Sequence, residues 1–210
     1  MKEFNRLVEI ITDLLGPNGC PWDQKQTLKS IRRHLIEESY EVVEAINEDD
    51  REKIVEELGD LFLNVVFLSK LGEKEKGIQI SEILDHINEK LIRRHPHVYG
   101  EAVAEDPEEV LRQWDKIKEQ EKKERKSKLD SIPKDLPSIL RAQKVCKIFR
   151  KAGFTPTHCL SQDPESEFGL KLYFLIKECS DLDIEADIAL RKVLNHYEKS
   201  YRESEEWNVT

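Results

Sequence analysis

The chain has 210 residues, of which 37% are charged and 38% hydrophobic, and its net charge is −9 at pH 7. This length allows one large domain or two small ones, and the balance of residues is typical of a helical protein with well-solvated outer faces. The acidic charge argues against nucleic-acid binding, which usually needs a basic face. It does not exclude small anionic substrates, because a bound divalent cation can invert the local charge.

Helical periodicity dominates the first half of the chain, and no alternating strand pattern stands out. Asp49 and Glu52 have capping-box spacing, and so do Asp106 and Glu109, so each pair marks the start of a helix. Pro96 ends the helix before it. We therefore expect helices at about residues 2–15, 27–46, from 49 onward, 81–95 and from 107 into 119–128.

A Pro-rich segment at residues 129–137 divides the chain, and three more helices are expected near 138–151, 168–179 and 184–206. Glu57-Leu58-Gly59-Asp60-Leu61 is similar to Glu167-Phe168-Gly169-Leu170-Lys171, and an apolar helix, a linker and a charged helix follow in each half. The halves therefore look like copies. We predict a first domain at 1–128, a connector at 129–137 and a shortened second copy at 138–210.

The cysteines are widely scattered and form no CxxC pair: Cys20, Cys146, Cys159 and Cys179. This pattern favours reduced thiols over a structural zinc site or a redox dithiol. The N-terminal helix is amphipathic, unlike a signal peptide, and no apolar run has the length of a membrane span. We therefore expect a cytoplasmic protein without a membrane partner.

Two pairs of carboxylates have the spacing of a metal site on neighbouring helices: Glu38 with Glu41, and Glu57 with Asp60. Residues three apart share a helical face, and a short turn makes the two helices antiparallel neighbours. Clustered carboxylates repel one another, and a hard cation removes that repulsion. Oxygen ligands suit Mg²⁺ or Mn²⁺ rather than zinc. The alternative is that these acids are only solvated surface residues. Gly59 favours the metal site, since a helix-interior glycine costs about 1 kcal/mol and is expected where backbones approach closely.

Further motifs accompany the carboxylates in a fixed order: GCPWDxxQT at 19–27, KLIRRHPHVY at 90–99, and IP, LP and RAQK between 132 and 144. With the EExxE and ELGD segments they resemble the MazG family of nucleoside triphosphate pyrophosphohydrolases. The likeness extends over residues 1 to about 154. It implies an all-α fold with a four-helix core that usually dimerises. It also implies hydrolysis between the α- and β-phosphates, which releases a nucleoside monophosphate and pyrophosphate.

The resemblance assigns roles to the acids. Glu38, Glu41, Glu57 and Asp60 match the metal ligands. Glu37 matches the remaining acid of the motif, where it would orient the attacking water, so we assign Glu37 and Glu38 as catalytic candidates. The chain contains no GxxxxGK[ST] sequence, which excludes a P-loop mechanism.

Basic and aromatic residues supply candidate substrate contacts. Lys90 and Arg94 share a helical face. They either bind phosphates or are basic residues favoured by the dipole at the helix C-terminus. The resemblance favours phosphate binding. Trp114 with Lys118 either offers a base-stacking surface and a cation, or is a core tryptophan in an amphipathic helix. Trp22 fits better as a loop anchor than as a base contact.

The second copy lacks the metal-site pattern. No EExxE precedes Glu167, Leu170 stands where the first copy has Asp60, and His196 and Ser200 replace the basic pair. The chain therefore either relies on its first copy or has lost the activity. We expect a homodimeric, Mg²⁺-dependent hydrolase that removes nucleotides from the cellular pool. The alternative is a catalytically weak, nucleotide-binding or regulatory helical dimer.

Overall fold

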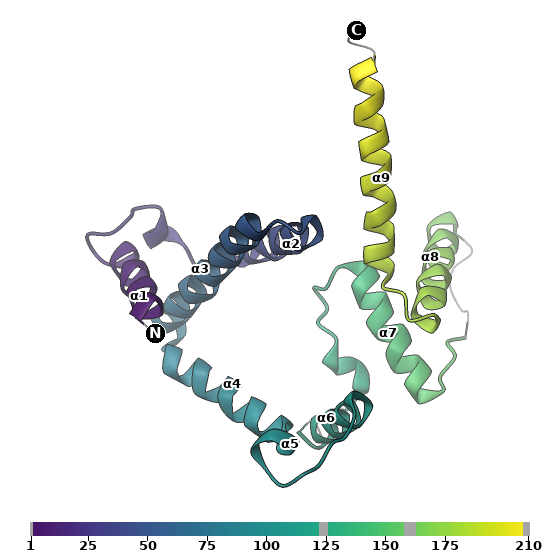
Figure 1. Cartoon of the computed structure of the whole chain (residues 1–210), viewed down its shortest axis with the longest axis horizontal. Helices are drawn as coiled ribbons and strands as arrows, with labels where there is room; N and C mark the ends of the chain where they lie inside the picture. Colours follow the sequence, from purple (N-terminus) through teal and green to yellow (C-terminus); the bar gives the residue numbers. More distant parts are fainter. Residues whose placement is uncertain (1, 122–125, 158–162, 208–210) are drawn as a thin grey trace. The chain divides into compact units, whose positions relative to one another are not determined.

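A computed structural model describes residues 2–121, 126–157 and 163–207 of the chain (Figure 1). Every regular element in these ranges is helical, which confirms the all-α fold. None of these helices is long and apolar enough to cross a membrane. The chain separates into two compact units, Met1–Glu119 and Gln120–Thr210. The predicted limits of the connector stay a prediction.

Among its described residues the first unit contains a 3₁₀ turn at Asp23–Lys25 and six α-helices: α1 Lys2–Leu15, α2 Arg32–Glu48, α3 Arg51–Lys76, α4 Ile80–Arg94, α5 Pro96–Tyr99 and α6 Pro107–Glu121, whose last two residues pass the limit of the unit. Its core lies where α1 and the loop before α2 pack on the C-terminal half of α3. The fully or nearly buried residues there are Ile11, Ile31, Val66, Phe67 and Leu71. This arrangement leaves the N-terminal half of α3 to pair with α2.

The loop between α1 and α2 is attached to α3 by hydrogen bonds. The Leu28 backbone N–H donates to Glu75 Oε1 over 2.8 Å, and Lys74 Nζ donates to the Gln24 carbonyl oxygen over 3.3 Å. Gly19 is required in this loop, because a Cβ there would clash with the carbonyl oxygens of Leu14 and Asp13. The loop therefore has one defined course between the helices.

Two helix starts differ from the sequence prediction. Thr27 and Ser30 form reciprocal side chain–backbone hydrogen bonds of 2.9 and 3.1 Å, and this turn delays the start of α2 from residue 27 to Arg32. The cap of α3 is Asp50 rather than Asp49. Asp50 accepts hydrogen bonds from the backbone N–H groups of Glu52 and Lys53. Asp49 instead ends α2 in the left-handed conformation, with φ 54°.

Two other predicted helix boundaries of the first unit are confirmed, and one of them also begins a further short helix. Asp106 Oδ1 accepts from the Glu109 backbone N–H over 2.7 Å, so it caps α6 as predicted. Pro96 does end α4, but it also opens the short helix α5, since proline suits the first position of a helix.

In the described part of the second unit there are three α-helices: α7 Ser138–Ala152, α8 Pro164–Asp181 and α9 Ala186–Trp207. A 3₁₀ turn at Lys128–Ser131 precedes them. Gln143 on α7 is buried and donates to the Ile184 carbonyl oxygen over 2.9 Å, while Arg150 donates to that of Ser180 over 2.8 Å. These bonds hold the turn between α8 and α9 against α7. The start of α8 was predicted near Phe168 and lies at Pro164, after the cap Asp163.

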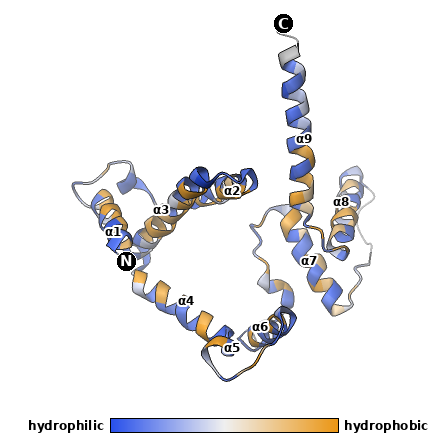
Figure 2. Ribbon diagram, viewed as in Figure 1, coloured by the Kyte–Doolittle hydropathy of each residue, from blue (hydrophilic) through white to orange (hydrophobic). Residues whose placement is uncertain are grey.

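Figure 2 shows orange, hydrophobic stretches along several helices of the first unit, and many of these apolar side chains are exposed. On α3, Val55 is 61% exposed and Phe62 is 53% exposed. On α4, the exposed apolar residues are Ile83, Leu84, Ile87, Leu91 and Ile92. These three-to-four-residue spacings form helical stripes of the kind that pack against another helix.

Candidate metal centre

The α2–α3 hairpin brings the predicted acids together. Asp49 and Asp50 form its turn, and the two helices pack along their length. Glu38 and Glu41 lie on α2, and Glu57 lies on α3. One carboxylate oxygen from each of these three residues lies within 4.8 Å of the other two. Two antiparallel helices thus present an all-oxygen ligand set that suits a hard cation.

The pKa values of two of these carboxyls are raised, first by desolvation and then by the like charges around them. For Glu38 the causes are desolvation first, then the Glu41 carboxylate, then the charges of Asp60 and Glu57. For Glu57 the causes are desolvation first, then Glu41, followed by weaker contributions that include Asp60. A cation at this position would remove the repulsion, so the ligand set fits a divalent metal.

Asp60 and Glu37 lie beside this group rather than in it. Asp60 is exposed one turn after Glu57, and its charge acts on both Glu38 and Glu57. Glu37 accepts a hydrogen bond of 2.7 Å from Arg33 Nε, and His34 Nδ1 lies 3.8 Å from its other oxygen. Their roles as fourth ligand and water-orienting acid stay predictions.

Gly59 lies open beside the acids. A Cβ built at this position meets no atom within 4 Å. The expectation that Gly59 permits a close approach of two backbones within the chain is therefore wrong. The helix keeps an unfilled surface next to the carboxylates, at a position where alanine would be a better helix former.

A second cluster joins three of the four predicted substrate contacts. Arg94 is buried at the end of α4, and its Cζ lies 5.8 Å from the Trp114 ring centroid. Lys118 Nζ lies 3.9 Å from the same centroid. Trp114 is half-buried on α6, and Lys90 is half-buried one turn before Arg94 on α4. The structure therefore places two cations on one indole ring.

Trp22 lies against a histidine of α2, and two further histidines lie near Trp114. Trp22 is 56% exposed and meets the His34 ring edge-on at 6.2 Å, so it is not buried as a loop anchor would be. The rings of His95 and His97 lie 5.6 Å apart, and the His95 ring lies 6.2 Å from that of Trp114. Sequence reasoning missed the neighbours His34 and His95, although their spacings from Glu37 and Leu91, three and four residues, suit contacts on one helical face.

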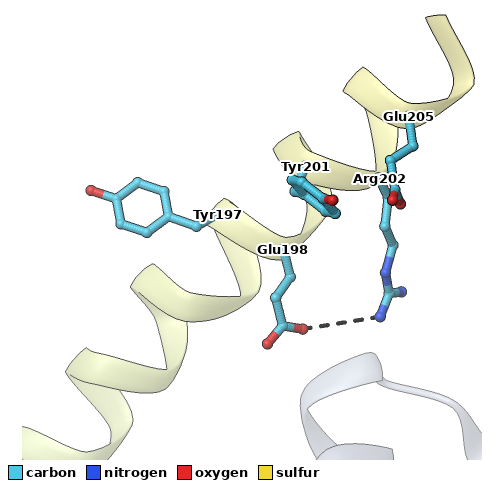
Figure 3. Close-up of a pocket in the computed structure, with 5 residues that line it drawn as sticks. All are labelled: Tyr197, Glu198, Tyr201, Arg202 and Glu205. Atoms are coloured by element: carbon cyan, nitrogen blue, oxygen red, sulfur yellow. Dashed lines mark ion pairs between the residues drawn. The ribbon is translucent and has the colours of Figure 1, made fainter. Parts of the chain in front are cut away.

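The second unit has no counterpart of the carboxylate group among its described residues. Leu170 lies on α8, and the Ser200 hydroxyl on α9 donates back to the His196 carbonyl oxygen over 3.0 Å. Figure 3 shows a hollow along α9 lined by Tyr197, Glu198, Tyr201, Arg202 and Glu205. All its lining residues come from a single helix, and Arg202 pairs with Glu198 at 4.0 Å, so the hollow does not form a binding site comparable to the carboxylate group.

Comparisons with known proteins agree with this architecture. The model of the MazG nucleotide pyrophosphohydrolase domain matches residues 26–99, which include all the predicted metal ligands. A crystal structure of a mazG-related protein from Thermotoga maritima superposes with a TM-score of 0.50 at 29% identity, and the match covers 55% of this chain and 98% of that one.

Full-length relatives extend the match beyond the domain. The chain is 36% identical over 231 residues to the nucleoside triphosphate pyrophosphohydrolase of Escherichia coli, covering 98% of this chain and 88% of that protein. It is 34% identical over 229 residues to the nucleoside triphosphate pyrophosphohydrolase/pyrophosphatase MazG of Thermotoga maritima, with the same coverage. It is also 45% identical over 146 residues to the uncharacterized protein YabN of Bacillus subtilis, of which it spans only 30%. The chain therefore belongs to the MazG family of nucleotide pyrophosphohydrolases.

Proposed function

We propose that the chain hydrolyses nucleoside triphosphates to nucleoside monophosphates and pyrophosphate, with Mg²⁺ or Mn²⁺ held by its carboxylate group. The observation that carries the proposal is the convergence of Glu38, Glu41 and Glu57 within 4.8 Å on the α2–α3 hairpin. Two relatives that match nearly the whole chain carry the name of this activity. Asp60 completes the proposed ligand set from the next turn of α3.

The cation would neutralise part of the triphosphate charge and stabilise the charge that develops on the departing pyrophosphate. The protein's own groups supply positioning and proton transfer. Glu38 and Glu37 are the proposed acids that hold and deprotonate the attacking water. Glu37 must exchange its bond with Arg33 for one with that water, whereas Glu38 already shares its environment with the other ligands.

Lys90, Arg94 and Lys118 are the proposed phosphate contacts. Arginine and lysine bind phosphate oxygens through charge-assisted hydrogen bonds, and the indole of Trp114 fixes two of these cations. Removal of any of these charges is expected to raise KM more than it lowers kcat, because the ground state already carries the triphosphate charge.

Product analysis tests the proposal. Purified protein is incubated with a panel of nucleoside triphosphates, with Mg²⁺, with Mn²⁺ and with EDTA, and the products are separated. We expect a monophosphate and pyrophosphate only when a divalent cation is present. Release of orthophosphate and a diphosphate would place the attack at another phosphorus. Binding without turnover would instead indicate a nucleotide-binding module.

Substitution of Asp60 by asparagine tests the fourth ligand. We expect this variant to lose nearly all cation-dependent turnover, since one negative oxygen is removed from the proposed site. Glu52→Gln, at an exposed acid in the first turn of the same helix, is the matched control. Equal activity in the Asp60 variant and the control would remove Asp60 from the ligand set.

We also propose that the chain is a homodimer, in which a second copy covers the exposed apolar stripes of α3 and α4. These stripes are too extensive for an isolated small helical unit to leave in water. Light scattering at micromolar concentration should give about twice the chain mass of 24.6 kDa. A mass equal to one chain would contradict this.

A further inference from the structure

The end of α4 and the middle of α6 meet at one aromatic ring. Arg94 Cζ and Lys118 Nζ lie 5.8 and 3.9 Å from the Trp114 ring centroid. Cations within about 6 Å of an indole are attracted to its face. An ammonium this close also covers the face of the ring that it contacts. Trp114 therefore holds cations, rather than offering that face to a nucleotide base.

Hydrogen bonding does not orient this tryptophan. Its Nε1 is buried and has no hydrogen-bond partner among the residues that the structure describes, and the same is true of Nδ1 of the nearby His97. Arg94 and Lys118 make cation–π contacts with the indole, and the ring of His95 packs against it. His95 is itself fixed by a hydrogen bond between its ring and the backbone.

His95 joins the last turn of α4 to the indole. It is the residue that ends α4, and its Nδ1 lies 2.6 Å from the Leu91 carbonyl oxygen. A carbonyl oxygen only accepts, so Nδ1 carries the proton and donates it. With that nitrogen anchored, the imidazole lies against Trp114 at 6.2 Å between centroids and an interplanar angle of 49°. An anchored ring at the end of α4 thus packs against the indole of α6.

We propose that His95 is a positioning residue for substrate binding. It orients the Trp114 ring, and through that ring it fixes Lys118 of α6 next to Arg94 of α4, so that the two cations meet the phosphates together. The inference rests on the proposed function, in which these cations bind the triphosphate. His95 itself need not touch the substrate.

Two substitutions separate the ring of His95 from its hydrogen bond. His95→Asn keeps an N–H that can donate to the Leu91 carbonyl oxygen but removes the ring, whereas His95→Phe keeps a ring without the hydrogen bond. We expect the asparagine variant to unfold at the parent temperature, with KM raised about tenfold and kcat changed less than about twofold. The phenylalanine variant should have a KM between that of the parent and that of the asparagine variant. His86→Asn, at an exposed histidine of the same helix, is the matched control and should keep the parent KM.

A double-mutant cycle tests whether His95 acts through the indole. In a Trp114→Leu background, and separately in a Lys118→Gln background, His95→Asn should raise KM by less than about twofold. An undiminished tenfold rise in both backgrounds would overturn the inference, and so would a parent-like KM for His95→Asn alone.

The Lys118→Gln variant by itself separates failure of the inference from failure of the proposed phosphate contacts. A raised KM in this variant supports the cation role on which the inference rests. If Lys118→Gln keeps the parent KM while the parent turns over triphosphates, the proposed phosphate contact is wrong and the inference is overturned with it. Circular dichroism melting of each variant confirms that the comparison is between folded proteins.

Discussion

The raised pKa of Glu38 links the carboxylate group to the stability of the metal-free protein. In the folded state the neutral form of Glu38 is favoured by desolvation and by the neighbouring Glu41. Between its ordinary pKa of 4.5 and the raised value, the folded chain binds more protons than the unfolded one. The free energy of unfolding therefore falls as pH rises through that window, and the stabilisation is complete only below it.

This linkage predicts the behaviour of Glu38→Gln. In EDTA, the variant should match or exceed the parent melting temperature at neutral pH, and its advantage should shrink toward pH 4.5, because glutamine carries no charge to repel Glu41 and Glu57. Added Mg²⁺ should then stabilise the parent more than the variant. Thermal unfolding across this pH range measures both effects. Parallel curves for the parent and the variant, with the Glu52→Gln control, would contradict the prediction.

At the scale of helices, the two aspartates of the α2–α3 turn have different roles. Asp50 caps α3 with its side chain, and Asp49 adopts a positive φ as the C-terminal cap of α2. Asp50→Ala should lower the free energy of unfolding by about 1 kcal/mol, since it removes the cap. Asp49→Gly should leave it unchanged or raise it, since glycine tolerates a positive φ. Urea unfolding of both variants is the measurement. An equal loss in both would contradict this division of roles.

Gly59 on α3 and Gly169 on α8 occupy the same position in the two similar segments, so the same substitution can be compared at both. A Cβ at Gly59 or at Gly169 meets no atom within 4 Å. Each change to alanine should therefore raise the free energy of unfolding by about 0.5–1 kcal/mol, through helix propensity alone. Urea unfolding tests both variants. A loss of stability or of dimer mass in Gly59→Ala, but not in Gly169→Ala, would show that another chain packs against α3 at this point.

The two copies also expose the same helical positions. Leu58, Phe62 and Val65 on α3 correspond to Phe168, Leu172 and Leu175 on α8, by the alignment of the two glycines, and all six side chains are exposed. The second unit thus has an exposed apolar face at the positions that the predicted repeat pairs with those of the first, and Leu170 at the position paired with Asp60. This is the pattern expected of a helical unit retained for packing rather than for metal binding.

For the whole molecule, the separation into two units predicts the outcome of a truncation after Ser131. All proposed ligands and substrate contacts lie in the first unit, Met1–Glu119. The fragment should keep cation-dependent turnover per folded molecule, with a lower melting temperature or weaker self-association, because the second unit would act as a buttress. Initial-rate assays and light scattering on the fragment and the full chain provide the comparison.

One outcome would assign a catalytic part to the second unit. A folded fragment that binds a nucleoside triphosphate with Mg²⁺, but releases no pyrophosphate, would show that residues after Ser131 contribute to the reaction. The full-length protein assayed in parallel serves as the control for nucleotide binding and for turnover.

The sequence by itself determined the class of fold, most helix limits and the pairing of acids. Heptad-like apolar spacing, proline and the Asp106 cap are local signals, and a helix depends chiefly on local bonds. The i, i+3 spacing of Glu38 with Glu41 places them on one face of any α-helix, so the first two proposed ligands could be paired from the sequence. The short turn after this helix then predicted that the next helix packs antiparallel to it.

Only the tertiary structure decided which groups meet across helices. It delayed α2 to Arg32 because Thr27 and Ser30 bond to each other, and it gave the α3 cap to Asp50 because Asp49 takes a left-handed conformation. It also removed the close approach expected at Gly59 and set the His95 ring beside Trp114. The two helix starts depend on competing hydrogen bonds between neighbouring residues, and the other outcomes depend on how the helices lie relative to one another. Residue spacing by itself does not choose between these alternatives.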